Sequence, residues 1–444
     1  MLKKIISFIG STIFLLSFTL SNAHADLTPA AGETVPGFPC TKVGQTSVYA
    51  DRTGVKKITC KKFGKNVLLW DFGVPAYPVP TTEVADAQQK ATVVVSASPK
   101  PTPTNIPGTS FKWPTPSGDL NKYSGIPKDG HAEDLLGLKE LHEAGITGKG
   151  YSLAFIDATI VTDNPAFEKT EMVCVGALDP LLNFGERACP SKYPDYSHGQ
   201  GVAGTMGGAY GVAPGARLIS IDVNYEFKVS FTVPNEKRSA IVRGLQWVLA
   251  HYKEYKIAAV SVSVGDRASR ANTVCGIASP IGLYEVVKKL SEADVAVIFS
   301  TANAATINWV REPNCLPGVI AVASVDSDDP RRIADYSSIS PDIDLLAPAD
   351  FMSAGMNGKD GVFGGTSQAA PFAAGLFALG KEARPDANIA QIFYFIKQSA
   401  APVSDVFVKR IPVVLPAEMV KALQSAKTLP PIKLVKQIQI KSGR

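Results

Sequence analysis

Five short apolar runs, each with few polar residues, limit what this chain can fold into. They cover residues 151–157, 217–223, 257–264, 295–301 and 318–325. Such runs are typical of parallel strands that are buried on both faces of a sheet. Amphipathic helical stretches lie between them, chiefly residues 237–255 and 281–292. The alternation predicts a doubly wound α/β domain with a mostly parallel sheet, whose site lies beyond the carboxyl ends of the strands.

The composition is that of a packed globular protein, since 45% of the 444 residues are hydrophobic and 19% are charged. The formal net charge of +5 comes from the ends of the chain. Lys3 and Lys4 lie at one end, and the acid-free tail of residues 427–444 lies at the other. The body between them is close to neutral, so it has no electrostatic footprint for nucleic acid.

Residues 1–25 have the pattern of a secretory signal peptide. Two lysines precede an apolar run over residues 5–20, and Ala23-His24-Ala25 has the small-x-small pattern of a cleavage site. The alternative is an uncleaved anchor, but the run is shorter than the ~20 residues that a bilayer span needs. We therefore expect a protein that is secreted or held in the cell envelope, with no membrane span after cleavage.

The remaining chain divides by composition into four parts. We predict a small β module with two cysteines over residues 26–74, and a linker rich in Pro, Thr and Ser over residues 75–125. The α/β domain follows over residues 126–426, and then the basic tail over residues 427–444. The small module either attaches the protein to the cell wall or another surface, or serves only as a spacer.

The six cysteines fit an oxidising compartment, and no two of them form a C-x-x-C motif. An even number in an exported chain indicates structural disulfides and leaves no cysteine over as a nucleophile. Pairing of sequence neighbours keeps each bridge within one local region. The predicted bridges are Cys40–Cys60, Cys174–Cys189 and Cys275–Cys315.

One histidine of the mature chain differs from the others in its surroundings. His142 and His251 fall in amphipathic helical runs, where a solvated or partly packed imidazole is expected, and His131 lies at a helix start. His198 instead opens a run of small residues, 198–208, which suits a helix packed closely against a sheet at a site.

Three further residues are placed where they can do chemistry. Asp157 ends an apolar strand, where its carboxylate must be hydrogen-bonded. Asn303 follows another strand, where its amide can donate to a developing oxyanion. Ser367 lies at the start of a Gly/Ala-rich helix, whose free N–H groups favour negative charge. Taken alone, each of these residues is better explained as a turn residue or a helix cap.

Taken together, these segments resemble the subtilisin-like serine peptidases. The matching segments are residues 148–157, 198–204, 211–216 and 365–371. They carry Asp, His and Ser in the chain order of that family's triad, which differs from the order in chymotrypsin and in the α/β-hydrolases. The resemblance covers about residues 126–426.

The resemblance implies a role for each of these residues. Ser367 is the expected nucleophile, His198 the general base and then acid, and Asp157 the carboxylate that orients the imidazole. Asn303 is expected to donate to the oxyanion, together with the backbone N–H of Ser367.

Two segments are expected to bind substrate on the same ground. Ser263, Val264 and Gly265 match an edge on which a peptide adds as a β-strand. The opposite wall of the pocket before the scissile bond is matched by Ser300, Thr301 and Ala302.

The chain departs from the family's usual pattern beside these residues, without loss of a catalytic atom. Ala158-Thr159 stands where Thr-Gly is common, and Gln200-Gly201 replaces Thr-His. Ala302 replaces a glycine, and Gln368 replaces a methionine.

The leading hypothesis is a secreted serine endopeptidase that acts on proteins or peptides through an acyl-enzyme and needs no metal or cofactor. Structural calcium occurs in the family, but no local carboxylate cluster assigns such a site here. One alternative is a weak or inactive peptide-binding scaffold on the same fold. The other is an exported esterase or acyltransferase that uses the same triad.

Overall fold

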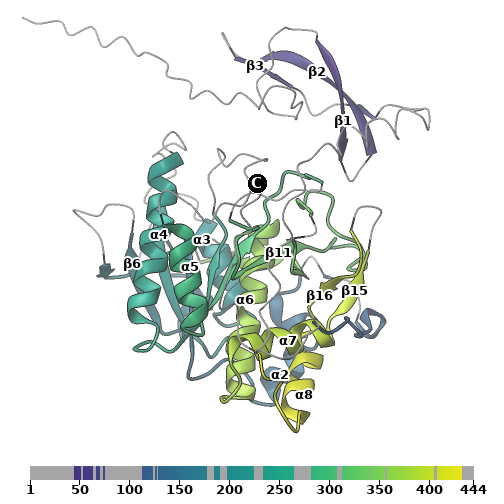
Figure 1. Cartoon of the computed structure of the whole chain (residues 1–444). Helices are drawn as coiled ribbons and strands as arrows, with labels where there is room; N and C mark the ends of the chain where they lie inside the picture. The colour runs from purple at the N-terminus through teal and green to yellow at the C-terminus, as the bar shows by residue number, and fades with distance from the viewer. Residues whose placement is uncertain are drawn as a thin grey trace, which may run out of the picture.

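A mostly parallel sheet forms the centre of the larger domain (Figure 1). The computed structural model describes residues 45–51, 54–63, 67–70, 74–75, 113–123, 126–127, 129–177, 185–190, 198–224, 234–264, 282–307, 313–340, 342–355, 358–404 and 408–432. Within these residues the strand order is β15-β16-β12-β11-β10-β9-β5-β8-β6-β7. The pairs from β16 to β6 are parallel, and only the pairs at the two edges, β15–β16 and β6–β7, are antiparallel.

The five predicted strands are confirmed, each within two residues at either end. They are β5 (Ser152–Ala158), β8 (Arg217–Asn224), β9 (Ile257–Val262), β10 (Ala296–Ser300) and β11 (Val319–Ser324). The sheet is completed by β6 (Met172–Gly176), β7 (Gly185–Arg187), β12 (Leu345–Ala347), β15 (Ala401–Val403) and β16 (Ile411–Val413). A separate hairpin consists of β13 (Phe351–Ala354) and β14 (Asp360–Phe363).

Helices cover both faces of the sheet, as the alternating sequence pattern predicts. On one face lie α3 (His198–Met206) and α6 (Thr366–Ala383), with α7 (Ile389–Ser399) and α8 (Pro416–Ser425) outside α6. On the other face lie α4 (Pro234–His251) and α5 (Leu283–Glu292), which match the two predicted helices. The short α2 (Leu138–Glu143) and the 3₁₀ turns η1 (Leu120–Lys122), η2 (Ala132–Asp134) and η3 (Pro165–Phe167) complete the domain.

Alternate residues of the central strands enter two different cores. In β5, Leu153 and Phe155 belong to the core beneath α3 and α6, whereas Ala154 and Ile156 belong to the core beneath α4 and α5. All seven residues of this strand are buried. The strand therefore has no polar face, which is why its sequence is an apolar run and not an alternating one.

The predicted β module is present as a small antiparallel sheet. Its strands are β1 (Thr46–Asp51), β2 (Gly54–Phe63), β3 (Val67–Trp70) and β4 (Val74–Pro75). Both β1 and β3 pair with β2, as does β4, and Cys60 lies opposite Trp70. Cys40 and the predicted signal peptide lie outside the described residues.

A disulfide joins Cys174 in β6 to Cys189, which follows β7, as predicted. The two cysteines are 15 residues apart in sequence, and the bond links β6 to the chain that directly follows β7. Cys315 is also disulfide-bonded, and its predicted partner Cys275 lies outside the described residues.

The larger domain extends beyond both boundaries predicted for it. Residues 113–119, which we name the strap, pack against it before the predicted start at residue 126. Gly118 N donates to Ala400 O at 2.9 Å, and Trp113 makes an edge-on contact with Phe393. At the other end Ile432 is 5% exposed, and its carbonyl accepts from Asn388 Nδ2. The Pro-, Thr- and Ser-rich composition predicted a linker up to residue 125. That prediction is wrong for residues 113–119, because a proline-rich segment can pack when it carries an aromatic anchor such as Trp113.

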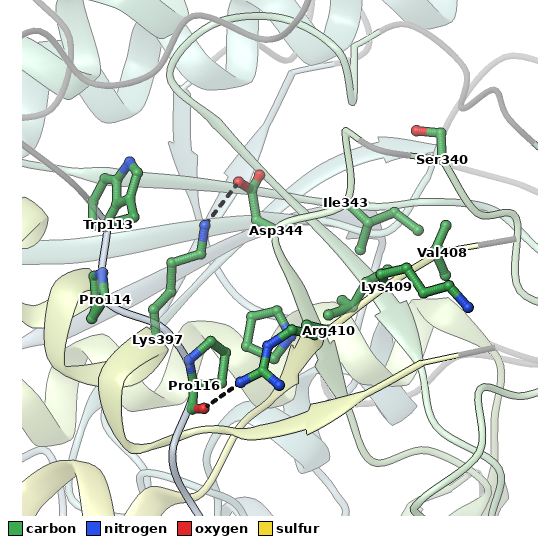
Figure 2. Close-up of a pocket in the computed structure, with 12 residues that line it drawn as sticks. Trp113, Pro114, Pro116, Ser340, Ile343, Asp344, Lys397, Val408, Lys409 and Arg410 are labelled. Carbon is green, nitrogen blue, oxygen red and sulfur yellow. Dashed lines mark hydrogen bonds and ion pairs between the residues drawn. The ribbon is translucent and has the colours of Figure 1, made fainter.

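A cavity of about 350 Å³ lies between the strap and β16, the strand next to the sheet edge (Figure 2). Lys397 Nζ lies 3.8 Å from Asp344 Oδ1 and 5.1 Å from the centre of the Trp113 ring. Arg410 donates to the carbonyl oxygen of Pro116 at 3.2 Å. The residues that line this cavity include none of the expected catalytic ones.

Replacement of Trp113 by alanine removes the contacts that hold the strap on α7. We expect Trp113→Ala to lower the free energy of unfolding by about 1–3 kcal/mol, less than for a fully buried tryptophan because the ring is half-buried. Urea unfolding followed by circular dichroism measures this, with Val362→Ala, a change at a 64% exposed side chain, as control. Equal stability of Trp113→Ala and wild type would show that the strap adds nothing to the fold.

Candidate active site

Asp157 lies near the carboxyl end of β5 and is fully buried. Its Oδ1 accepts hydrogen bonds from Ala158 N and from His198 Nδ1, both at 2.7 Å. The pairing of β5 with β8 shifts register between Asp157 and Ala158. An irregularity of this kind re-aims a side chain at the end of a strand. The carboxylate is thus held on the side of the sheet where α3 begins.

His198 is the first residue of α3, and a glycine brings it to Asp157. A Cβ on Gly199 would overlap the carbonyl oxygen of Ala158, so only glycine allows α3 to start this close to the end of β5. The His198 side chain is 21% exposed, whereas that of Asp157 is buried. One ring nitrogen is therefore fixed by the carboxylate while part of the ring stays accessible.

The replacements next to His198 fit the local packing. The buried Gln200 side chain forms two hydrogen bonds with the backbone of Val161, accepting from N and donating to O at 3.0 Å each. At Gly201, a Cβ would lie 2.5 Å from the ring of Phe363. That ring contacts His198 edge-on, with centroids 5.1 Å apart. The sequence does not point to Phe363, because its only signal is its position before the Gly-Gly-Thr-Ser segment.

Ser367 is the second residue of α6, and Gly365 precedes the helix with φ 78°. Ser367 Oγ donates to Ser263 O at 3.3 Å, and Ser263 Oγ donates to Ser367 O at 3.0 Å. Pro371 lies inside the helix and has no N–H for the carbonyl four residues earlier, which is that of Ser367. The Ser263 hydroxyl takes the place of that missing donor. The end of β9 and the start of α6 are thereby joined directly beside Ser367.

Asn303 follows β10 and contacts the start of α6. Its Oδ1 accepts from Thr366 N at 2.9 Å and from Thr366 Oγ1 at 2.8 Å. Because both partners are donors, the acceptor end of the amide is occupied, and Nδ2 is the end available to a further acceptor. Gly365 is required here too, since a Cβ would lie 2.5 Å from Asn303 Nδ2. Thr366 is a second residue that sequence analysis missed.

The side chain of Gln368 is fully buried and binds the backbone of the chain that enters β13. Its Oε1 accepts from Asp350 N at 2.7 Å, and its Nε2 donates to Phe351 O at 3.2 Å and to Thr205 Oγ1 at 3.3 Å. In place of a methionine, the chain thus has an amide that fixes α6 to two neighbouring elements.

The residues expected to bind substrate lie at the ends of two adjacent parallel strands, β9 and β10. Ser263 and Val264 follow β9 directly, and Gly265 lies outside the described residues. Ser300 ends β10, and its carbonyl accepts from Asn314 Nδ2 at 3.0 Å. Thr301 is buried, whereas Ala302 is partly exposed.

The other histidines make local structural contacts. His142 Nε2 lies 3.0 Å from Val212 O, and His251 stacks on Trp247 and contacts its carbonyl. His131 precedes η2, and its Nε2 lies 2.9 Å from Asp360 Oδ2. No three His, Cys, Asp or Glu residues in the described part of the chain lie close enough to hold a metal ion.

Ala302 has a left-handed backbone, with φ 76°. A left-handed conformation costs a residue with a Cβ about 1–2 kcal/mol, and glycine loses about 0.4–1 kcal/mol more chain entropy on folding. We therefore expect Ala302→Gly to stabilise the protein by up to about 1 kcal/mol in urea unfolding. The neighbouring Ala304 has no positive φ, so Ala304→Gly should instead destabilise. Equal effects of the two changes would contradict the assignment of strain to Ala302.

The chain is similar in sequence to known subtilisins. The chain is 28% identical over 266 residues to subtilisin NAT of Bacillus subtilis subsp. natto, covering 57% of this chain and 61% of that protein. A subtilisin of Bacillus pumilus is also 28% identical, with 84% of its length covered. The chain thus spans less than two thirds of the length of the first of these relatives.

Two solved structures have a similar fold. MycP1 from Mycobacterium smegmatis has a TM-score of 0.53 at 19% identity, covering 79% of this chain and 99% of that one. The prenylagaramide maturation protease PagA has a TM-score of 0.51 at 20% identity, covering 65% and 98%. The model of the subtilase family matches residues 148–425, which is more than half of the chain. This chain therefore belongs to the subtilase family.

Proposed function

We propose that this protein is a serine endopeptidase that hydrolyses peptide bonds through an acyl-enzyme on Ser367. The proposal is carried by one observation: four segments distant in sequence, those of Asp157, His198, Asn303 and Ser367, lie at one edge of the sheet. Asp157 binds His198 at 2.7 Å, and Asn303 binds Thr366, the neighbour of Ser367, at 2.9 Å. The family match over residues 148–425 supports the same assignment.

In the first step, Ser367 Oγ attacks the substrate carbonyl carbon while its proton passes to His198 Nε2. Because the Ser367 hydroxyl donates to Ser263 O in this structure, the O–H must turn toward the imidazole before transfer. Asp157 holds the proton on Nδ1 and stabilises the imidazolium that forms. His198 then protonates the leaving amine, which departs and leaves the acyl-enzyme.

The negative oxygen of the tetrahedral intermediate is expected to bind between Asn303 Nδ2 and the backbone N–H of Ser367. The Asn303 carbonyl is held by Thr366, so its amide donor needs no reorganisation when charge develops. In the second step water attacks the acyl carbon, His198 takes its proton, and Ser367 is released with that proton.

The peptide is expected to extend along residues 263–265, at the end of β9, by β-strand addition. Residues 300–302, at the end of β10, would form the opposite wall of the pocket before the scissile bond. Export through the signal peptide of residues 1–25 and attachment to the envelope through the β module are parts of the same proposal. No helix among the described residues meets the length and apolarity that crossing a bilayer requires.

A fluorophosphonate probe tests the activated nucleophile directly. We expect the probe to label Ser367 in the purified wild-type protein, as mapped by peptide mass spectrometry, and to leave Ser367→Ala unlabelled. Casein cleavage and hydrolysis of a simple ester are measured beside it. Ester hydrolysis without casein cleavage would favour the esterase. An unlabelled but folded wild type that still binds peptides would favour the inactive scaffold.

Replacement of Asn303 by alanine removes the proposed side-chain donor. We expect Asn303→Ala to lower kcat by about 10²- to 10³-fold, the range found when one oxyanion-hole donor is removed from a subtilisin. KM should change little, because the interaction forms only in the transition state. Loss of Oδ1 also removes both contacts with Thr366, so thermal unfolding is measured as a control. A rise in KM at unchanged kcat would contradict this role.

A further inference from the structure

The loop that carries Asn303, which we name the oxyanion loop, comprises residues 302–306. Two of its residues, Ala302 and Ala305, have left-handed backbones, with φ 76° and 52°. Neither is glycine, so the loop is strained and its surroundings must hold it in place. Local sequence offers no reason for this conformation.

A segment between β11 and β12 provides that support. Ser338 N donates to Ala302 O at 3.0 Å, and Ala305 N donates to Tyr336 O at 2.8 Å. Ile339 N donates to Thr306 O at 2.8 Å. The backbone of residues 336–339 thus binds residues 302, 305 and 306, which include both ends of the oxyanion loop.

The loop that carries Ser367, which we name the nucleophile loop, comprises residues 364–367 and is held by Asp350. Gly365 N donates to Asp350 Oδ1 at 3.2 Å. Asp350 is itself fixed, because its N–H donates to the buried Gln368 Oε1 at 2.7 Å. Its backbone is also left-handed, with φ 65°.

One side chain joins these two supports. The Tyr336 hydroxyl donates to Asp350 Oδ2 at 2.7 Å and lies 3.1 Å from Ser324 Oγ at the end of β11. Burial, together with the Asp350 carboxylate, raises the pKa of Tyr336, so the phenol keeps its proton and remains a donor. Tyr336 therefore contacts the oxyanion loop through its carbonyl and the nucleophile loop through Asp350.

We propose that Tyr336 and Asp350 are positioning residues that set the oxyanion loop and the nucleophile loop relative to each other. They act on the two oxyanion donors through Ala305 and Gly365 and do not contact the substrate. The proposal rests on the function proposed above for Asn303 and Ser367. A positioning role also explains why Asp350 keeps a left-handed backbone, because the contact with Tyr336 compensates for that strain.

Tyr336→Phe keeps the ring and removes only the hydroxyl. We expect kcat for peptide hydrolysis to fall about 10- to 100-fold with KM changed less than about 3-fold, because misplaced groups lose transition-state contacts. Tyr255→Phe is the matched control. It removes another phenol–carboxylate hydrogen bond, to Glu186 at 2.7 Å, at the far edge of the sheet. Its kcat should equal that of wild type.

A double-mutant cycle separates positioning from general stability. In an Asn303→Ala background one of the two donors is already absent, so Tyr336→Phe should cost markedly less than in wild type. Equal fold losses in the two backgrounds, or an unchanged kcat, would overturn the proposal. Asp350→Asn, which keeps the shape of the side chain, is the second variant and should behave like Tyr336→Phe.

Hydrogen exchange in a Ser367→Ala background tests the coupling without turnover. We expect Tyr336→Phe to speed exchange in peptides covering both the oxyanion loop and the nucleophile loop, and Tyr255→Phe to leave them unchanged. Faster exchange in neither loop, or in one alone, would contradict the coupling. An inactive wild type that nevertheless shows coupled exchange would count against the proposed function only.

Discussion

The burial of β5 on both faces is the constraint on which the rest of the structure depends. Because every residue of this strand is buried, the carboxylate of Asp157 near its carboxyl end must find partners within the protein. The partners are the following backbone N–H and the imidazole of His198. Both lie beyond the carboxyl edge of the sheet, which is where parallel sheets generally form their sites. The fold thus buries a carboxylate that requires hydrogen-bond donors, and His198 is one of them.

Close approach of two helices to this edge depends on small residues. Gly199 lets α3 begin against the end of β5, and Gly365 lets the chain enter α6 beside Asn303. At Pro371 the helix gives up one internal hydrogen bond, and Ser263 satisfies the carbonyl that is left. The site is therefore held in part by side chains that bind backbone groups with no partner in their own helix or strand.

The departures from the usual subtilase pattern are parts of the local packing. Gln200 binds the chain after β5, and Gly201 leaves room for Phe363, whose ring contacts His198. Gln368 binds Asp350, and Asp350 binds both Gly365 and Tyr336. Gln200, Gly201 and Gln368 thus each have a partner elsewhere in the chain.

Apolar runs in the amino-acid sequence predicted the α/β class, the five central strands and the two helices on one face, all of which the structure confirms, and its motifs predicted roles for Asp157, His198, Asn303 and Ser367. These follow from apolar runs and from four ordered motifs, which are local properties of the chain. Only the folded chain shows the contacts of Phe363, Thr366, Tyr336 and Asp350 and the extension of the domain to residues 113 and 432. Each of these depends on a contact between segments distant in sequence, such as that of Tyr336 with Asp350 or of Trp113 with Phe393. No local pattern records such a contact, because the geometry that creates it exists only once the chain has folded.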